Sequence, residues 1–133
     1  MTIFIDASAM ISMMTGESDA SELADQMEAE QLRLCSAISL WETIAGLCRK
    51  YTFSVPSARR VVQSFVELNE INLVAIGERE FELATQAYAE FGKGRHSAAL
   101  NLGDCFAYAC AKSNRAKLLF KGDDFTKTDI VDL

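Results

Sequence analysis

The strongest constraint on the fold is the alternation of short β-branched segments with longer segments of helical periodicity. Residues 2–5 read TIFI, show no polar alternation and end abruptly at Asp6. Such a run is typical of a central parallel strand that is buried on both faces. Further strands are expected at 33–35, 71–75, 116–120 and 129–132. Strands that alternate with helices in this way predict an α/β fold built on a parallel sheet.

The helices expected between these strands each have a recognisable start or an apolar stripe. Residues 36–51 place Leu40, Ile44, Leu47 and Tyr51 on one face, which is the spacing of a buried helical stripe. Asn101 is the expected cap of a helix over 102–113. The other helices are expected from 7 to about 15, from a cap at Ser18 to about Glu30, from Pro56 onward, and over 79–91, where Phe81, Tyr88 and Phe91 are interpreted as core residues.

Length and composition predict a single domain over residues 1–133. No segment approaches the roughly 20 consecutive apolar residues of a membrane-spanning helix. The first residues lack the basic region of a secretory signal, so we expect a cytoplasmic protein. The four cysteines show no zinc-ligand spacing and are interpreted as small buried apolar residues.

The net charge of −6 is concentrated at one end of the chain. Residues 1–32 contain seven acids and no lysine or arginine, and the remainder is close to neutral. A chain of this sign has no general attraction for nucleic acid. Any phosphate-binding surface must therefore be a local patch or a metal site.

Acidic residues recur where a parallel α/β sheet collects its ligands, at the carboxyl ends of the strands and the loops that follow them. Asp6 directly follows the first predicted strand, and Asp123 and Asp124 follow the fourth. Glu42 and Asp104 lie in predicted helices among apolar neighbours. A buried carboxylate without a partner costs several kcal/mol, and the nearby sequence supplies few bases.

One shared divalent cation would satisfy these carboxylates, and a set of oxygen ligands suits Mg²⁺ or Mn²⁺. Without the cation, mutual repulsion should raise the pKa of at least one of them. A cation held in this way supports phosphodiester hydrolysis. Each acid also has an ordinary alternative role. These alternatives are a helix cap for Asp6, an ion pair with Arg49 or another base for Glu42, a favourable helix dipole for Asp104, and turn positions for Asp123 and Asp124.

Two further groups of residues are candidates for supporting roles. Ser8 is expected either to orient Asp6 or a metal-bound water, or to serve only as a helix-start hydroxyl. Residues 92–96 read GKGRH, a glycine loop from which Lys93, Arg95 and His96 could contact substrate phosphates; the alternative is that they are ordinary surface charges. Glycine-rich nucleotide-binding loops are absent from the sequence, so a nucleotide cofactor is not indicated.

Several blocks, in order over essentially the full length, carry a family resemblance. Residues 4–8 read FIDAS, and Glu42 follows in a helix. The most specific block is FGKGRHSAALNLGDCFAYA at 91–109, followed by LLFKGDDF at 118–125 and TDI at 128–130. Together these blocks resemble the PIN-domain ribonucleases and, among them, the VapC toxins of bacterial VapBC toxin–antitoxin modules.

The resemblance implies a three-layer α/β/α sandwich with a central, mainly parallel sheet of four to five strands. It implies an Mg²⁺- or Mn²⁺-dependent endoribonuclease with Asp6, Glu42 and Asp104 as its acidic triad. The same likeness implies a fourth acid, for which we favour Asp124 over its rival Asp123. Asp6, Asp104 and Asp124 are then expected to bind the metal, and Glu42 to bind it or to position the water that attacks RNA. It also implies homodimerisation and neutralisation by a VapB-type antitoxin encoded beside the toxin.

Two other classes of function remain open at this point. One is a non-catalytic PIN-like module that binds RNA or a protein partner. The other is a phospho-acceptor domain of the receiver type, with an aspartate at a strand end. The sequence disfavours the second, because its acids are spread through helices and no lysine is obviously paired with them.

Overall fold

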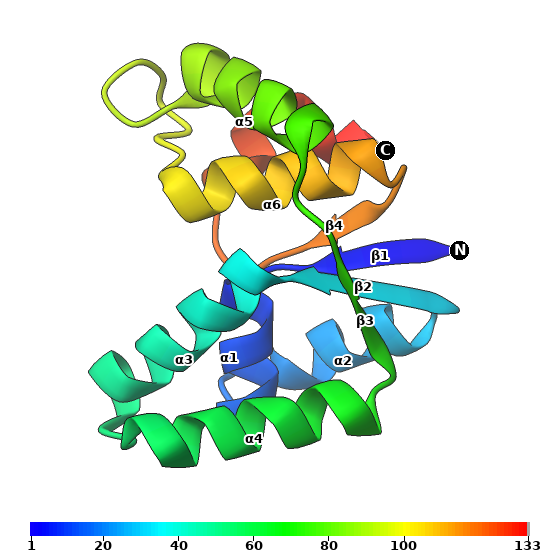
Figure 1. The fold of residues 1–133 in the computed structure, drawn as a ribbon, viewed down its shortest axis with the longest axis vertical. Helices are drawn as coiled ribbons and strands as arrows, with labels where there is room; N and C mark the ends of the chain where they lie inside the picture. The colour runs from blue at the N-terminus through cyan, green and yellow to red at the C-terminus, as the bar shows by residue number, and fades with distance from the viewer. Residues whose placement is uncertain (133) are drawn as a thin grey trace.

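A computed structural model describes residues 1–132, and Figure 1 shows its sheet lying between two groups of helices. In chain order the elements are β1 (Thr2–Ile5), α1 (Ala7–Thr15), α2 (Ala20–Glu28), β2 (Leu32–Ser36), α3 (Ala37–Tyr51), α4 (Val55–Leu68), β3 (Ile71–Val74), α5 (Glu78–Phe91), α6 (Leu102–Ser113), β4 (Lys117–Leu119) and two 3₁₀ turns, η1 (Asp124–Lys127) and η2 (Asp129–Asp132). The predicted α/β alternation is confirmed.

The four strands form one parallel sheet in the order β3-β2-β1-β4. Phe4 of β1 lies opposite Leu34 of β2 and Leu118 of β4, so β1 is the central strand that its uninterrupted apolar sequence predicted. Because all pairs are parallel, the carboxyl ends of the strands share one edge of the sheet. That edge is where Asp6 leaves β1.

Each face of the sheet has its own apolar core, which makes the three layers. Phe4 and Leu34 point to the face covered by α5 and α6. Ile3, Ile5 and Cys35 point to the opposite face, where α1 and α2 pack. These side chains alternate because successive strand residues face opposite sides. Figure 1 shows α5 and α6 on one side of the sheet and α1 to α4 on the other.

Local hydrogen bonds set the start of the helix that carries Glu42. The Ser36 hydroxyl accepts from the Ser39 backbone N–H at 3.2 Å, and the Ser39 hydroxyl accepts from the Ser36 N–H at 2.9 Å. This capping box satisfies two backbone donors that a helix start leaves free. The junction between β2 and α3 is therefore tight, and it fixes where the later turns of α3 point.

The predicted strand over 129–132 is wrong, because Asp129–Asp132 forms the 3₁₀ turn η2. The Asp129 carboxylate accepts hydrogen bonds from the Tyr108 hydroxyl at 2.6 Å and the Lys112 ammonium at 2.8 Å, which hold the turn against α6. Ile130 is buried in the core on that side. These tertiary contacts outweigh the β-branched composition of the segment, so the described sheet has four strands.

The acidic first segment is neutralised by bases from the far end of the chain. Lys121 pairs with Glu17 and with Asp19, and Lys117 pairs with the buried Glu30. Asp19 rather than the expected Ser18 occupies the N-cap position of α2, although its side chain makes no cap bond. Its carboxylate instead accepts from the Ser12 hydroxyl. Ion pairs and α1 therefore decide where α2 begins.

The described residues contain no candidate membrane-spanning helix, and most of their cysteines are buried. Within residues 1–132 no helix combines the length and apolar character needed to cross a bilayer. Cys35, Cys105 and Cys110 are buried and Cys48 is partly buried, and all four are free thiols. The interpretation of the cysteines as core residues is confirmed for the first three.

Candidate active site

Asp6 lies at the carboxyl end of the central strand, where the chain turns into α1. Its backbone N–H donates to the Leu119 carbonyl at 2.9 Å and so continues the pairing of β1 with β4. Its carboxylate is buried, with only 4% of the residue exposed. The same carboxylate caps α1 by accepting from the Ser8 N–H at 3.1 Å. The alternative role as a helix cap is thus real, and it coexists with burial of an acid at the ligand-binding edge.

Ser8 connects Asp6 to the loop that follows β4. Its hydroxyl donates to Asp6 Oδ2 at 2.6 Å and accepts from the Lys121 backbone N–H at 2.9 Å. One side chain therefore fixes both the carboxylate and the start of the segment that carries Asp123 and Asp124. The contact of Ser8 with Asp6 was predictable from the sequence. Its contact with Lys121 was not, because no local pattern links residues 113 positions apart.

Substituting Ser8 with alanine is expected to weaken Mn²⁺ binding at this edge by roughly 10- to 100-fold, the usual effect of losing a group that orients a metal-binding carboxylate. The Ser8 backbone N–H remains, so α1 keeps its cap and the variant should fold. The Mn²⁺ affinity of the variant, measured by calorimetric titration, can be compared with that of Ser21→Ala, which alters an exposed serine on α2. Equal affinities for Ser8→Ala and the wild type would remove Ser8 from the site.

Glu42 projects from the second turn of α3 and packs against the first turn of α6. It is partly buried, and its carboxylate lies directly over the Cα of Gly103. Within the described residues no lysine or arginine nitrogen lies within ion-pair distance of it. Arg49 lowers its pKa only as the smallest of four influences, so the ion-pair alternative is not supported.

Asp104 is the third residue of α6 and is tied to the helix start. Its backbone N–H donates to Asn101 Oδ1 at 2.9 Å, and its Oδ2 accepts from the Asn101 N–H at 3.1 Å. This reciprocal cap confirms Asn101 as the start signal of α6. The cap leaves Asp104 partly buried beside the same sheet edge, in electrostatic contact with Asp6 and Asp124.

Asp123 and Asp124 lie in the exposed turn after β4, and they differ in their electrostatic influence. The charge of Asp124 raises the pKa of both Asp6 and Asp104, whereas Asp123 is not among the charges that do so. Asp123 instead uses its carbonyl to accept from the N–H and hydroxyl of Thr126, which shapes η1. The charge of Asp124 therefore acts on two of the candidate acids, and the main chain of Asp123 shapes the turn.

Three of these carboxyl groups have pKa values above their ordinary range. Burial raises the pKa of Glu42 to about 7, and repulsion from Asp6 and Asp104 adds to the rise. Burial raises the pKa of Asp104 to about 6. The hydrogen bond from the Asn101 N–H lowers this pKa, and the charges of Asp6 and Asp124 raise it further. Burial also raises the pKa of Asp6, although the hydrogen bonds from Ser8 oppose it. Acids from β1, α3 and α6 thus share one electrostatic field.

The donors at this edge fit a hard divalent cation in their chemistry. All are carboxylate oxygens, partly or fully buried in three of four cases, with mutual repulsion that a dication would relieve. Within the described residues, no three His, Cys, Asp or Glu side chains are arranged so that they could hold a metal as they stand. Mg²⁺ usually binds through one or two carboxylates and keeps several waters, so these donors fit such a cation in type, and binding by three of them would require side-chain movement.

The raised pKa of Asp104 predicts a pH-dependent stability difference between the metal-free wild type and Asp104→Asn. The folded carboxyl group keeps its proton to a higher pH than the unfolded one, with pKa values of about 6 and 3.8. The wild type therefore loses stability relative to the variant as the pH rises through this interval. At pH 7.5 in EDTA, Asp104→Asn should be more stable by roughly 2 kcal/mol, and near pH 4 the two should converge. Urea unfolding at both values measures the difference; a difference independent of pH would contradict the assigned burial.

The glycine loop supplies none of the charges that most affect the pKa values of these acids. Lys93, Arg95 and His96 are exposed, and the Arg95 guanidinium lies 4.9 Å from the centroid of the Tyr88 ring. His96 packs edge-on against Phe91, and its Nδ1 accepts from the Ala98 N–H at 3.0 Å. The loop therefore presents two cations to solvent, and the histidine stabilises the loop's own conformation.

The interpretation of Phe81 and Tyr88 as core residues is wrong, since they are 57% and 47% exposed. Small residues on both helices, including Ala84, Ala87 and Ala107, fill the core side of α5 and α6. Phe81 and Tyr88 instead line an open groove of about 560 Å³ between the two helices. The exposed Leu102 and the side chain of Lys93 also border it.

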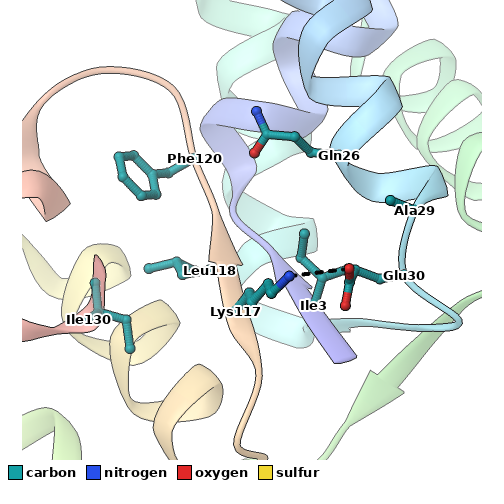
Figure 2. A pocket seen from close by; sticks show the side chains of 8 residues that line it. All are labelled: Ile3, Gln26, Ala29, Glu30, Lys117, Leu118, Phe120 and Ile130. Atoms are coloured by element: carbon teal, nitrogen blue, oxygen red, sulfur yellow. Dashed lines mark hydrogen bonds and ion pairs between the residues drawn. The ribbon is translucent and has the colours of Figure 1, made fainter. Parts of the chain in front are cut away.

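A separate cavity of about 320 Å³ lies along β4, away from the acids, and Figure 2 shows its lining. Leu118, Phe120 and Ile130 form its apolar wall. The ion pair of Lys117 with Glu30, drawn as a dashed line, forms the polar wall. Because Lys117 and Glu30 neutralise each other, this cavity differs from the carboxyl edge of the sheet, where the candidate acids have no such basic partner among the described residues.

Comparison with known proteins gives concordant results. The family model described as PIN domain matches residues 3–131. The chain is 40% identical to Ribonuclease VapC30 of Mycobacterium tuberculosis over 95% of its own length and 94% of that protein, and 37% identical to Ribonuclease VapC of Mycolicibacterium smegmatis over 95% of each.

Similar solved structures include Mycobacterium tuberculosis VapC20, a toxin that cleaves the sarcin–ricin loop, and a toxin–antitoxin complex from Klebsiella pneumoniae. The TM-scores are 0.69 and 0.68, with 14% and 20% sequence identity. The VapC20 match covers 98% of both chains; the complex match covers 96% of this chain and 93% of the other. At these identities the structural matches establish the fold, a three-layer α/β/α sandwich.

Proposed function

This chain belongs to the PIN-domain family, and from that premise we propose that it is a metal-dependent endoribonuclease and the toxin of a toxin–antitoxin module. The observation that carries the proposal is the convergence of Asp6, Glu42 and Asp104 from three elements on one edge of the sheet. Their pKa values are raised by burial and by one another's charge. Relatives with 34–40% identity over nearly the whole chain are named as VapC ribonucleases, which supports the same activity.

In this proposal Asp6, Asp104 and Asp124 hold Mg²⁺ or Mn²⁺, with Asp123 as the rival of Asp124. When bound, such a cation supplies electrostatic stabilisation of the phosphodiester and a more acidic water. Ser8 keeps the Asp6 carboxylate in one orientation. Glu42, whose pKa burial raises to about 7 in the metal-free chain, binds the cation in this proposal or positions the attacking water. The products expected from the family are a 5′-phosphate and a 3′-hydroxyl.

The substrate in this proposal is single-stranded or looped RNA, whose backbone can bend toward a recessed group of acids. Lys93 and Arg95 supply local positive charge from the glycine loop, although the chain as a whole carries −6. Lys121, after β4, pairs with Glu17 and Asp19 and therefore adds less free positive charge. A solvent-exposed loop of two cations is suited to phosphate contacts that depend on salt.

Protein partners complete the proposal. A similar structure is a toxin–antitoxin complex, which supports a VapB-type antitoxin as the partner that neutralises this chain. The exposed groove with Phe81, Tyr88 and Leu102 offers apolar surface of the kind that protein contacts cover. We also propose a homodimer and, since RNA is the substrate, action in the cytoplasm.

The direct test is incubation of purified protein with bacterial RNA in Mg²⁺ or Mn²⁺, followed by sequencing of the new RNA ends. The proposal expects a small number of discrete sites with 5′-phosphate ends, and their loss when the antitoxin is added. An inactive preparation that still binds RNA would favour the non-catalytic module instead.

Replacing both Lys93 and Arg95 with alanine is expected to weaken RNA binding by about tenfold and to reduce the slope of log K against log salt by about one to two units. The active-site acids are untouched, so cleavage at saturating RNA should change by less than the affinity does. A matched control is Arg59→Ala with Arg60→Ala, which removes two exposed cations from α4. An unchanged salt slope in the loop variant would leave the loop without a role in RNA binding.

A further inference from the structure

Gly103 contacts the Glu42 carboxylate at the position that a β-carbon on residue 103 would occupy. It is buried as the second residue of α6, and the Glu42 carboxylate group from α3 lies against it. A β-carbon built on Gly103 would overlap Cδ, Oε1 and Oε2 of Glu42 together. The space that an alanine methyl group would need is therefore filled by one of the proposed active-site acids.

The backbone gives no separate reason for glycine at this position. Positive φ angles occur at Gly16, Gly94 and Gly122, and Gly103 is not among them. Glycine is a poor helix former, so alanine would favour α6 if the position were otherwise free. The reason for glycine must lie in what packs against it, and that neighbour is Glu42.

We propose that Gly103 is a positioning residue whose missing side chain seats the Glu42 carboxylate beside Asp104. This inference rests on the proposed ribonuclease function. Gly103 and Asp104 are consecutive residues, and the hydrogen bonds between Asn101 and Asp104 fix both in the first turn of α6. The spacing between the two acids is thus set by the first turn of α6 as well as by α3. An added methyl group at residue 103 would push the carboxylate away while leaving Asp104 where it is.

The test combines Gly103→Ala, Glu42→Ala and the double variant, using the full chain. Cleavage kinetics are measured in Mg²⁺ or Mn²⁺, and thermal unfolding is measured in EDTA. Gly103→Ala should lower kcat at least tenfold with KM within about twofold of the wild type, because positioning rather than RNA affinity is lost. In Glu42→Ala the space that the Glu42 carboxylate filled is empty, so the methyl group of Gly103→Ala fits there. The change in Tm caused by Gly103→Ala should therefore be more favourable in the Glu42→Ala background than in the wild type.

The remaining outcomes either overturn the inference or support it. Wild-type kcat in Gly103→Ala would overturn it. An equal fall of Tm in both backgrounds would also overturn it, since glycine would then serve the packing of α6 alone. If Gly103→Ala does not fold but the double variant does, Glu42 is the cause and the inference holds; if neither folds, it fails.

Different results would contradict the ribonuclease function and the positioning role of Gly103. A wild-type protein without metal-dependent cleavage, assayed with an active relative as reference, would end the ribonuclease proposal. The difference in Tm between backgrounds would still report whether Gly103 seats Glu42. Conversely, an active wild type with an active Gly103→Ala variant would end only the positioning role.

Discussion

Replacing Asp6 with asparagine is expected to abolish RNA cleavage and, in metal-free buffer at pH 7.5, to raise the melting temperature. The carboxylate lies directly after the central strand, at the point where β1 and β4 end their pairing, and it is buried and oriented by Ser8. Loss of a metal-binding carboxylate removes several kcal/mol of transition-state stabilisation, which corresponds to a rate loss of about 10³-fold or more.

The expected gain in stability of Asp6→Asn comes from removing a buried charge that has no cation beside it in metal-free buffer. Burial raises the pKa of Asp6 in the folded protein, so folding stability is present below the unfolded pKa and is lost as the pH rises through the folded value. Asparagine carries no charge and still accepts hydrogen bonds from Ser8. The variant should therefore melt a few degrees higher than the wild type in EDTA.

Single-turnover cleavage and thermal unfolding, run on the same preparations, measure both effects. Asp25→Asn is the matched control, since it neutralises an exposed aspartate on α2 and should alter neither quantity. An Asp6→Asn protein that cleaves RNA at the wild-type rate would end the assignment of Asp6. A variant that loses both activity and stability would indicate that Asp6 serves mainly as a structural cap.

The fold was predictable to the extent that its signals are local. The uninterrupted apolar run before Asp6 identifies a central strand, and Asn101 three residues before Asp104 identifies a helix start. The segment after Thr128 was mispredicted, because a hydrogen bond from Tyr108 to Asp129 holds it as a turn. That contact joins residues 21 positions apart and leaves no periodic trace in the sequence.

Helical spacing identified one face of α5 but not which residues of that face are buried. Phe81 and Tyr88 follow the expected stripe, yet Ala84 and Ala87 make the tight contact with α6. Alanines allow the two helices to approach closely, which leaves no room between them for large rings. The spacing therefore predicted that these residues share one helix face, but side-chain size determined which of them are buried in the core.

The candidate acids were predictable from their places after strands and within apolar helices, whereas their supporting contacts were not. Ser8 was expected to orient Asp6, but its link to the Lys121 N–H depends on how the loop after β4 folds back. The seat of Glu42 on Gly103 depends on how α3 crosses α6. The expectation that at least one carboxyl pKa would be raised agrees with the values at Asp6, Glu42 and Asp104.

The second large expected effect concerns the cation. Chelation with EDTA should stop RNA cleavage, and addition of Mg²⁺ or Mn²⁺ should restore it fully. A cation at about 100 times its dissociation constant should also stabilise the folded chain by about 2.7 kcal/mol, because it binds the folded form alone. Thermal unfolding across a range of Mn²⁺ concentrations measures this; cleavage that persists in EDTA would contradict a metal-dependent mechanism.

The most direct measurement of whether these acids share one cation is calorimetric titration of Mn²⁺ into the metal-free wild type, Asp6→Asn and Asp104→Asn at pH 6.5. Repeating it in buffers of different ionisation enthalpy reports the protons released on binding. We expect one site per wild-type chain, proton release from carboxyl groups such as Glu42, and at least about tenfold weaker binding in each variant. Equal Mn²⁺ affinity in all three proteins would show that the carboxylates of Asp6 and Asp104 do not form a common metal site.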